Sequence, residues 1–237
     1  MITPLDNDYK DAKLIKQGKK RLETPFKELA EWINREYDVN VLNIYYDFIQ
    51  NGKRPRLNVI LEFLCDKNKF NISTETFYGY DGEKQAAISV KFNELLESES
   101  SKNRGFLKRL LSNKPNYKYD TNDILVTFGI FETVAKNEAN SNIPEEKIQE
   151  LKESINDNEL WEISRCFANT TFFFYTDVQL NQNKNNGKKE KLTELYYNLI
   201  KFYDEFDYIK KEDFLIFMDS KENFDNNYQG SWFYYYR

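Results

Sequence analysis

Residues 39–65 read VNVLNIYYDFIQNGKRPRLNVILEFLC. Asn51-Gly52 stands between two segments in which apolar and polar residues alternate, and this combination is the strongest short-range signal of a β-hairpin. If Asn51 and Gly52 are the two turn residues, Gln50 pairs with Lys53 and the register of every other cross-strand pair follows. The stretch therefore predicts two antiparallel strands joined by a tight turn.

The predicted register separates the two faces of the hairpin by polarity. Because successive side chains of a strand point to opposite faces, a slip of one residue would set apolar against polar side chains at almost every pair. The turn and the alternation thus favour the same register. The predicted pairs are Tyr46–Leu57, Ile44–Val59 and Leu42–Leu61 on the apolar face, and Asp47–Arg56 and Tyr45–Asn58 on the other.

Length and composition indicate a folded protein with an aromatic-rich core. The chain has 237 residues, enough for one large domain or two small ones, and contains 19 Phe, 17 Tyr and 3 Trp. Its net charge of −5 argues against a dedicated nucleic-acid-binding protein, which usually carries a positive field.

The residue types present exclude several kinds of chemistry. The chain has no histidine, so it lacks the commonest general base and the commonest zinc ligand. Cys65 and Cys166 are expected to be two buried thiols in a reducing compartment, the alternative being one structural disulfide. No signal-peptide pattern and no apolar run of ~18 residues occurs, so we expect a cytoplasmic protein that does not enter a membrane.

Periodicity predicts the elements around the hairpin. An amphipathic helix is expected over 25–36, and a second over 83–97. Residues 181–189, rich in Asn, Lys and Gly, are typical of a mobile loop tip. The other predicted elements are strands at 70–80, 124–131, 170–180, 214–218 and 232–236, and helices from Pro144 and over 192–206.

These elements predict an α+β fold with a mainly antiparallel, twisted sheet covered by three to four helices. The order helix, strand, turn, strand at 25–65 recurs at 190–237, which indicates two weakly related halves. We expect a basic N-terminal arm (1–22), an α+β half (23–98), a basic connector (99–122) and a second α+β half (123–237). The alternative is one continuous domain with 99–122 as a surface excursion.

Acidic residues supply the main enzymatic hypothesis, a Mg²⁺-dependent, carboxylate-based hydrolase or nuclease. Eight acids occur from Asp204 to Asp225, among them Asp204, Glu205, Asp207, Asp213, Asp219, Glu222 and Asp225, and residues 225–230 resemble the start of a calcium loop. However, the twelfth loop position is Tyr236 instead of a bidentate Glu, and a solvated turn also explains these acids. A restriction-type site at Asp47 and Glu62 fails because Leu64 stands where a Lys is required. We therefore expect no cofactor.

Two segments are candidate partner-binding surfaces. The final aromatic run, read as a strand, places Trp232, Tyr234 and Tyr236 on one face, with Tyr228 nearby; the run forms either an exposed patch or a strand covered on both faces. The basic segment with Lys102, Arg104, Lys108 and Arg109 could contact nucleic acid, an acidic protein or lipid, or could lie on the protein's own surface.

The leading hypothesis is a non-enzymatic, intracellular protein that binds another protein, such as an immunity-type neutraliser or an adaptor. Its basis is the lack of a residue pattern for covalent, acid–base or metal chemistry. Nucleic acid is an unlikely partner because of the negative charge. The sequence predicts neither the identity of the partner nor the oligomeric state.

Overall fold

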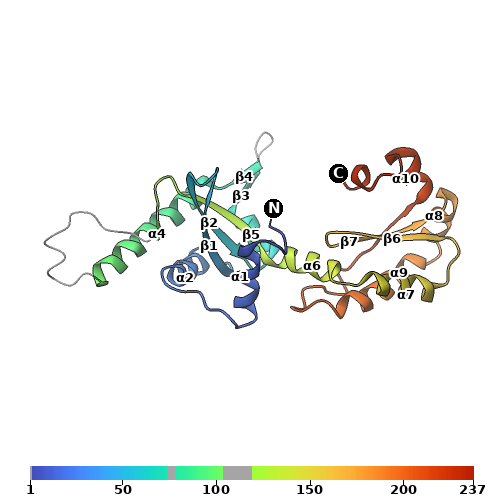
Figure 1. Cartoon of the computed structure of the whole chain (residues 1–237), viewed down its shortest axis with the longest axis horizontal. Coiled ribbons are helices and arrows are strands. Elements are labelled where there is room, and N and C mark those ends of the chain that lie inside the picture. Colours follow the sequence, from blue (N-terminus) through green and yellow to red (C-terminus); the bar gives the residue numbers. More distant parts are fainter. Residues whose placement is uncertain (1, 74–77, 104–118) are drawn as a thin grey trace. The chain divides into compact units, whose positions relative to one another are not determined.

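A computed structural model describes residues 2–73, 78–103 and 119–237 of the chain. The fold is α+β, as the sequence predicts, and the described residues form three small sheets packed with helices. The chain divides into two compact units, Met1–Val134 and Ala135–Arg237, and Figure 1 labels the helices and strands of both.

The first unit is built on a three-stranded sheet in the order β1-β2-β5. β1 and β2 are antiparallel, whereas β5 runs parallel to β2. Helices α2 and α4 pack with the sheet into one apolar core. The helices are α1 (Asn7–Lys16), α2 (Phe26–Tyr37), α3 (Leu64–Lys67), the 3-10 helix η1 (Asn68–Phe70), α4 (Gly82–Asn103) and the start of α6 (Phe131–Ser141), and the strands are β1 (Val41–Ile49), β2 (Arg54–Leu61), β3 (Asn71–Ser73), β4 (Tyr78–Tyr80) and β5 (Leu125–Ile130).

The predicted hairpin is β1-β2, and most of its register is confirmed. Ile44 pairs with Val59, Tyr45 with Asn58, Tyr46 with Leu57 and Asp47 with Arg56. The guanidinium of Arg56 donates to both carboxylate oxygens of Asp47, at 2.8 and 2.5 Å. This pair stabilises the polar face at the rung where the alternation predicts it.

Two details of the hairpin differ from the prediction. A bulge sets Val41, not Leu42, opposite Leu61. The turn has four residues instead of two: Lys53 N–H donates to the Ile49 carbonyl at 3.1 Å, and Gln50 and Lys53 do not join the ladder. The reason is that Gln50, Asn51 and Gly52 all have positive φ (53°, 57° and 81°), which closes a wider loop with an unchanged register.

Other segments of the first unit also depart from the expectations. Of the strand predicted at 70–80, residues 71–73 and 78–80 form β3 and β4 of a separate two-stranded sheet instead of joining the main one. The expected arm contains α1, whose Tyr9 and Ala12 are buried. Asp8 of α1 accepts a hydrogen bond from Asn58 at 2.7 Å. Asn58 follows Leu57 along β2, and the Leu57 side chain points into the core on the α2 side of the sheet, so the Asn58 side chain points to the other side. α1 therefore lies on the face of the sheet opposite α2.

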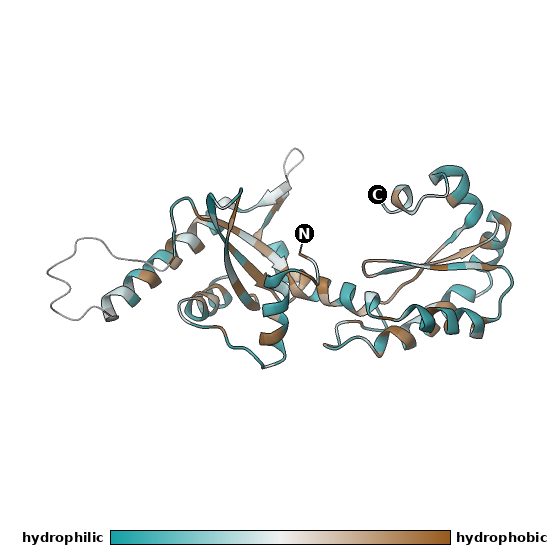
Figure 2. Ribbon diagram, in the orientation of Figure 1, coloured by the Kyte–Doolittle hydropathy of each residue, from teal (hydrophilic) through white to brown (hydrophobic). Residues whose placement is uncertain are grey.

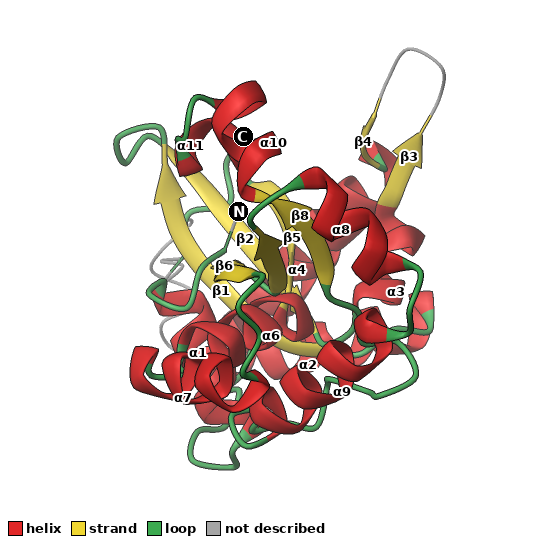
Figure 3. Ribbon diagram, turned by 90° about the vertical axis from the view of Figure 1, so that its right-hand side faces the viewer, coloured by secondary structure: helices red, strands yellow, loops and turns green. Residues whose placement is uncertain are grey.

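The second unit repeats the sheet arrangement in the order β6-β7-β8, with β6 and β7 antiparallel and β8 parallel to β7. Helices α7 and α9 cover one face, while α10 and α11 lie on the other (Figures 1 and 3). Its elements are the end of α6, α7 (Glu145–Ile155), β6 (Leu160–Cys166), β7 (Asn169–Phe174), α8 (Asp177–Lys184), α9 (Lys188–Lys201), β8 (Phe217–Ser220), α10 (Lys221–Tyr228) and α11 (Trp232–Tyr235).

Hydropathy explains these layers. In Figure 2 the strands of both sheets carry brown stretches between white and teal ones, whereas α7 and α10 are largely teal, as expected of helices with one face in water. The second core is aromatic as well as aliphatic, with Phe172, Phe174 and Tyr196 fully buried against the helices.

Several predictions for the second unit are wrong. The predicted loop at 181–189 is reduced to a turn at 185–187, because 181–184 end α8 and 188–189 start α9. A capping box at Thr176 starts α8 and ends the predicted strand 170–180 early. The predicted strand 232–236 is helix α11, and β6 and α6 were not predicted. The strand predicted at 214–218 is β8 (Phe217–Ser220), which lies at an edge of its sheet.

The division of the chain also differs from the expected connector at 99–122. β5 pairs with β2 and so lies in the first unit, and the two units meet within α6. Much of the expected connector, residues 104–118, lies outside the described residues.

The two units are structural repeats of one another. Each has a helix (α2 or α7), an antiparallel hairpin, a helical crossover, a parallel third strand and a helix that starts directly after it (α6 or α10). Both hairpins carry a bulge at the second residue of their first strand, Leu42 and Trp161. The predicted partner of 25–65 was therefore misplaced: its structural equivalent is 145–174, not 190–237.

Each repeat is closed by the same set of hydrogen bonds. In the first unit, the N–H of Glu132 donates to the carbonyl of Glu62 (3.0 Å), and its carboxylate accepts from the N–H of Leu64 (2.9 Å). Glu62 N–H in turn donates to Asn40, just before β1 (2.7 Å). These bonds tie the ends of β2 and β5 to the start of the hairpin.

The second unit has the equivalent bonds at the equivalent positions. Glu222 N–H donates to Tyr175 (3.3 Å), its carboxylate accepts from Asp177 N–H (3.0 Å), and Tyr175 N–H donates to Glu159 (3.1 Å). A carboxylate in the first turn of a helix is favoured by the helix dipole. Glu132 and Glu222 thus perform the same structural task in the two units.

We expect Gly52→Ala to lower the free energy of unfolding by about 1 kcal/mol, because a left-handed conformation strains a residue with a Cβ. Gly52 has φ +81° and no atom near its missing Cβ, so the effect comes from the backbone alone. Gly82→Ala is the matched control, since it has equal space and no positive φ. Urea unfolding measures both; equal effects would contradict the turn geometry.

Candidate protein-contact surface

The outer face of the second sheet is covered by the chain that follows β8. Ser220 caps α10, its hydroxyl accepting from the N–H of Asn223 at 2.8 Å. Gln229 and Gly230, with φ of 57° and 62°, then reverse the chain into α11 (Figure 3). This turn returns the aromatic run onto the sheet.

Trp232 is the centre of an aromatic cluster on this face. Its ring lies 4.2 Å from that of Phe224 and 5.3 Å from that of Phe173, and it stacks on Trp161 at 6.0 Å and 7°. Tyr235 packs against Phe173 at 5.2 Å. Such contacts bury large apolar areas in defined geometry, so α11 is held firmly although it has only four residues.

Two tyrosine hydroxyls anchor α11 to the strands. Tyr235 donates to the carboxylate of Asp219 at 2.6 Å, and Asn223 donates to both oxygens of that carboxylate at 2.9 and 3.0 Å. Tyr236 donates to Ser164 at 2.7 Å. The Asp219 carboxylate therefore joins β8, α10 and α11.

Burial raises the pKa of Tyr235 above its ordinary value of 10.0, and the hydrogen bond to Asp219 and the charge of that carboxylate raise it further. Burial likewise raises the pKa of Tyr236. Both hydroxyls are thus held in the neutral, donating form.

The face of α11 that turns away from the sheet presents Phe233 and Tyr234. Their side chains are 69% and 49% exposed, and their rings contact each other at 5.5 Å. Arg237 lies over the Phe233 ring, 5.9 Å from its centroid. We call Phe233 and Tyr234 the α11 pair.

The helical period explains why the sequence misassigned this surface. Residues 232, 235 and 236 lie on one side of a helix, whereas a strand would group 232, 234 and 236. Of the predicted aromatic contact residues, all of which the structure describes, only Tyr234 is on the outward side. Trp232 is only partly exposed, Tyr236 bonds to the sheet, and Tyr228 is half-buried with its ring 4.9 Å from that of Tyr235. Phe233 was not predicted.

The predicted basic surface is largely outside the described part of the chain. Lys102 lies near the end of α4, and its side chain is not described. Arg104, Lys108 and Arg109 fall within 104–118, outside the described residues. Their contact with a partner stays a prediction.

The acidic zone from Asp204 to Asp225 is engaged in local structure. Asp204 accepts from the N–H groups of Tyr208 (3.0 Å) and Ile209 (2.8 Å) and pairs with Lys201 (2.8 Å). Asp207 pairs with Lys201 and Lys210, and these hydrogen bonds and charges lower its pKa to about 2. The carboxylates of Asp204 and Asp207 thus each have partners within the protein.

The described residues contain no group of three acidic or cysteine side chains placed to hold a metal ion. Asp225, the first residue of the loop compared with a calcium site, pairs with Lys221. At the other proposed metal position, Asp47 binds Arg56 and Glu62 pairs with Lys16 at 2.5 Å.

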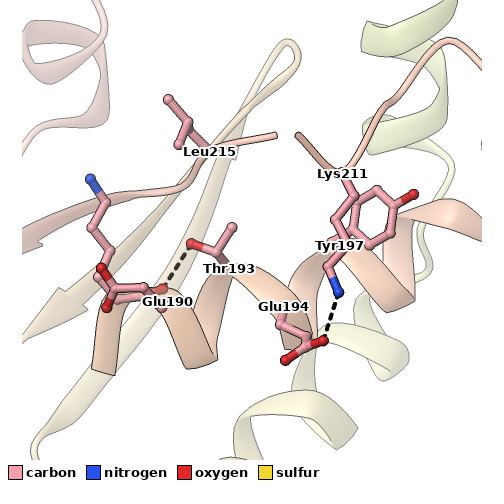
Figure 4. A pocket seen from close by; sticks show the side chains of 7 residues that line it. Glu190, Thr193, Glu194, Tyr197, Lys211 and Leu215 are labelled. Carbon is pink, nitrogen blue, oxygen red and sulfur yellow. Dashed lines mark hydrogen bonds and ion pairs between the residues drawn. The ribbon is translucent and has the colours of Figure 1, made fainter. Parts of the chain in front are cut away.

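A groove of ≈ 400 Å³ lies between α9 and the segment that leads into β8 (Figure 4). Thr193 and Tyr197 of α9 and Leu215 from the opposite side line it. Lys211 and Glu194 form an exposed ion pair at 2.8 Å at one end. The pair raises the pKa of Lys211 and lowers that of Glu194. The groove offers mixed apolar and charged contacts.

The two cysteines are free, and the expectation that both are buried is wrong for Cys65, which is exposed. Cys166 is half-buried, and desolvation raises the pKa of its thiol. Among the described helices, none has the length and apolar character needed to cross a bilayer.

Comparison with known proteins places no constraint on function. No family model, curated protein or solved structure matches the chain. The functional assignment therefore depends on the chemistry of the described residues.

We expect Tyr235→Phe to lower the free energy of unfolding by about 1.5 kcal/mol, because it removes a hydrogen bond to a charged acceptor and keeps the ring. Tyr234→Phe, one residue away and exposed, should change it by less than about 0.5 kcal/mol. Chemical unfolding at neutral pH measures both, and equal losses would contradict the anchoring role of Asp219.

Tyr235→Phe should also change how the free energy of unfolding depends on pH. The folded pKa of Tyr235 is raised, so its stabilising effect is fully present below pH 10 and is lost above it, where the unfolded chain ionises first. The stability of Tyr235→Phe should therefore fall less steeply above pH 10 than that of the parent chain.

Proposed function

We propose that this chain is a non-enzymatic, cytoplasmic protein that binds another protein through the α11 pair. The observation that carries the proposal is the exposure of two adjacent aromatic side chains on a helix whose other side is anchored by Trp232 and Tyr235. Large aromatic side chains that are held in place bind with little loss of conformational entropy, which is why Tyr and Trp dominate interface hot spots.

The position of these side chains favours recognition over core packing. Phe233 and Tyr234 are the outward residues of a segment that already packs Trp232 and Tyr235 against the aromatic side chains of the sheet, so the fold does not require them to be apolar. Replacement by polar residues would leave the cluster around Trp232 intact. A partner with a shallow apolar pocket fits this pair.

Charge distribution indicates the character of that partner. Ala135–Arg237 contains 19 acidic and 13 basic residues, a formal charge of −6, whereas Met1–Val134 contains 20 acidic and 21 basic residues, a formal charge of +1. The unit that carries the α11 pair is thus the acidic one. Its field accelerates association with a basic protein, a property suited to a neutraliser of a basic toxin or to an adaptor.

The test compares capture of proteins from the source cell by the parent chain and by Phe233→Ser/Tyr234→Ala. The protein whose capture depends on the pair is then purified, and its Kd should rise at least about tenfold with the double variant, as expected for a hot spot. Phe202→Ser is the matched control, because Phe202 is 88% exposed elsewhere in the same unit. Unchanged capture by a folded double variant would exclude this surface.

The competing hypothesis of a Mg²⁺-dependent hydrolase has no specific support, since Asp204, Asp207 and Asp225 are paired with lysines and no three acids of the described residues are placed to hold a metal ion. We expect 5 mM Mg²⁺, Mn²⁺ or Ca²⁺, roughly a saturating concentration for a functional site, to leave the melting temperature unchanged. A rise of several degrees with one of these ions would favour the hydrolase instead.

A further inference from the structure

The carboxylate that anchors α11 has only neutral partners among the described residues. Asp219 accepts hydrogen bonds from the hydroxyl of Tyr235 (2.6 Å), from the side-chain amide of Asn223 (2.9 and 3.0 Å) and from the N–H of Ser220 (2.8 Å). Within the described ranges, no lysine or arginine pairs with it. Neutral donors hold a carboxylate in place without cancelling its charge, so a net negative charge remains beside α11.

This charge acts on α11 and on the residue that follows it. Besides burial, the charge of Asp219 raises the pKa of Tyr235 and that of Tyr236. The unit around it is also negative, with 19 acidic and 13 basic residues and a formal charge of −6. Charges that are partly shielded from water interact over longer distances than fully solvated ones. The surroundings of the α11 pair therefore attract a cation.

The α11 pair presents aromatic ring faces to such a cation. The side chains of Phe233 and Tyr234 are both exposed, and their rings meet edge to face, with centroids 5.5 Å apart and planes at 68°. In this arrangement the two rings form an open corner, and each ring keeps at least one face clear of the other. Because the negative part of the ring quadrupole lies on the faces, the corner favours a positively charged group.

Arg237 shows which kind of cation this corner accepts. Its guanidinium carbon, Cζ, lies 5.9 Å from the centroid of the Phe233 ring, and no acid of the described residues pairs with it. The distance is close to the ~6 Å limit of a cation–π contact, so the contact is weak. A guanidinium group that stacks more closely would displace Arg237 at little cost.

We propose that the α11 pair binds an arginine side chain of the partner, whose guanidinium group takes the position that Arg237 occupies in the free chain. This inference rests on the proposed function, because it names the group that the same surface recognises. Arginine fits better than lysine, since its planar guanidinium group stacks on rings and is more weakly hydrated than an ammonium group. Its methylene stem adds apolar contact with the two rings.

The test measures binding of a hexa-arginine peptide to the full chain by titration calorimetry. Phe233→Leu keeps an apolar side chain and the charge of the chain but removes the ring, so it should raise the Kd about fivefold, as expected for a cation–π contact. Phe202→Leu is the matched control, because Phe202 is 88% exposed elsewhere in the same unit, and should leave the Kd unchanged. Equal Kd values for the parent chain and Phe233→Leu would overturn the proposal.

A second peptide tests the choice of arginine. Hexa-lysine has the same charge as hexa-arginine, so attraction to the acidic unit is the same for both peptides. Its Kd should change less than that of hexa-arginine when Phe233 is replaced by Leu, because an ammonium group loses more hydration on a ring face. An equal change with both peptides would overturn the selection of arginine.

Removal of Arg237 tests the position of the bound group. Arg237→Gln should lower the Kd for hexa-arginine more than Lys191→Gln does, because both variants remove one positive charge but only the first frees the Phe233 ring. Lys191 is a matched control, since it is exposed and forms no ion pair among the described residues. Equal effects of the two variants would overturn the assigned position.

These results separate the arginine site from the proposed function. A captured protein that depends on the α11 pair, together with hexa-arginine binding that ignores Phe233→Leu, would support the proposed function and overturn this inference. Hexa-arginine binding that depends on the ring, with no captured protein that depends on the pair, would support the arginine site and overturn the proposed function.

Discussion

The third strand of each sheet runs parallel to the second, and this constraint organises both units. A parallel neighbour cannot be reached by a hairpin, so the chain must cross one face of the sheet before it returns. α4 makes this crossing in the first unit, and α8 and α9 make it in the second. The crossover helices bury one face of the sheet, and another segment of the same unit must cover the other face. Glu132 and Glu222 then fix the helix that follows each third strand.

Different segments cover the second face of the sheet in the two units, and the surfaces of the units differ for that reason. α1 covers it in the first unit with Tyr9, Ala12 and the buried Asp8–Asn58 hydrogen bond. In the second unit α10 and α11 cover it with aromatic rings around Trp232. A four-residue helix can bury only one side of itself, so Phe233 and Tyr234 are left in solvent. The exposed aromatic surface is thus a consequence of covering a sheet face with a short helix.

The elements beside the third strand also differ between the two units. In the first unit, Tyr80 of β4 and Gln85 in the first turn of α4 donate side-chain hydrogen bonds to carbonyls of β5. The second unit has no element equivalent to β3 and β4 among its described residues; α8 packs against β8 instead, and Ser220 donates to Asp177 of α8. The third strands of the two repeats are therefore flanked by different elements.

The sequence by itself determined what depends on near neighbours: the β1-β2 register, the amphipathic helices α2 and α7, the residue types available for chemistry and the α+β class. Turn conformation and alternation act over a few residues, so they can be read locally. The tertiary structure alone decided that β5 joins the first sheet, that 232–236 is helical and that residues 145–174 repeat 26–61. Short apolar runs fit a helix or a strand equally well, and strand partners distant along the chain are chosen by packing, which no local pattern encodes.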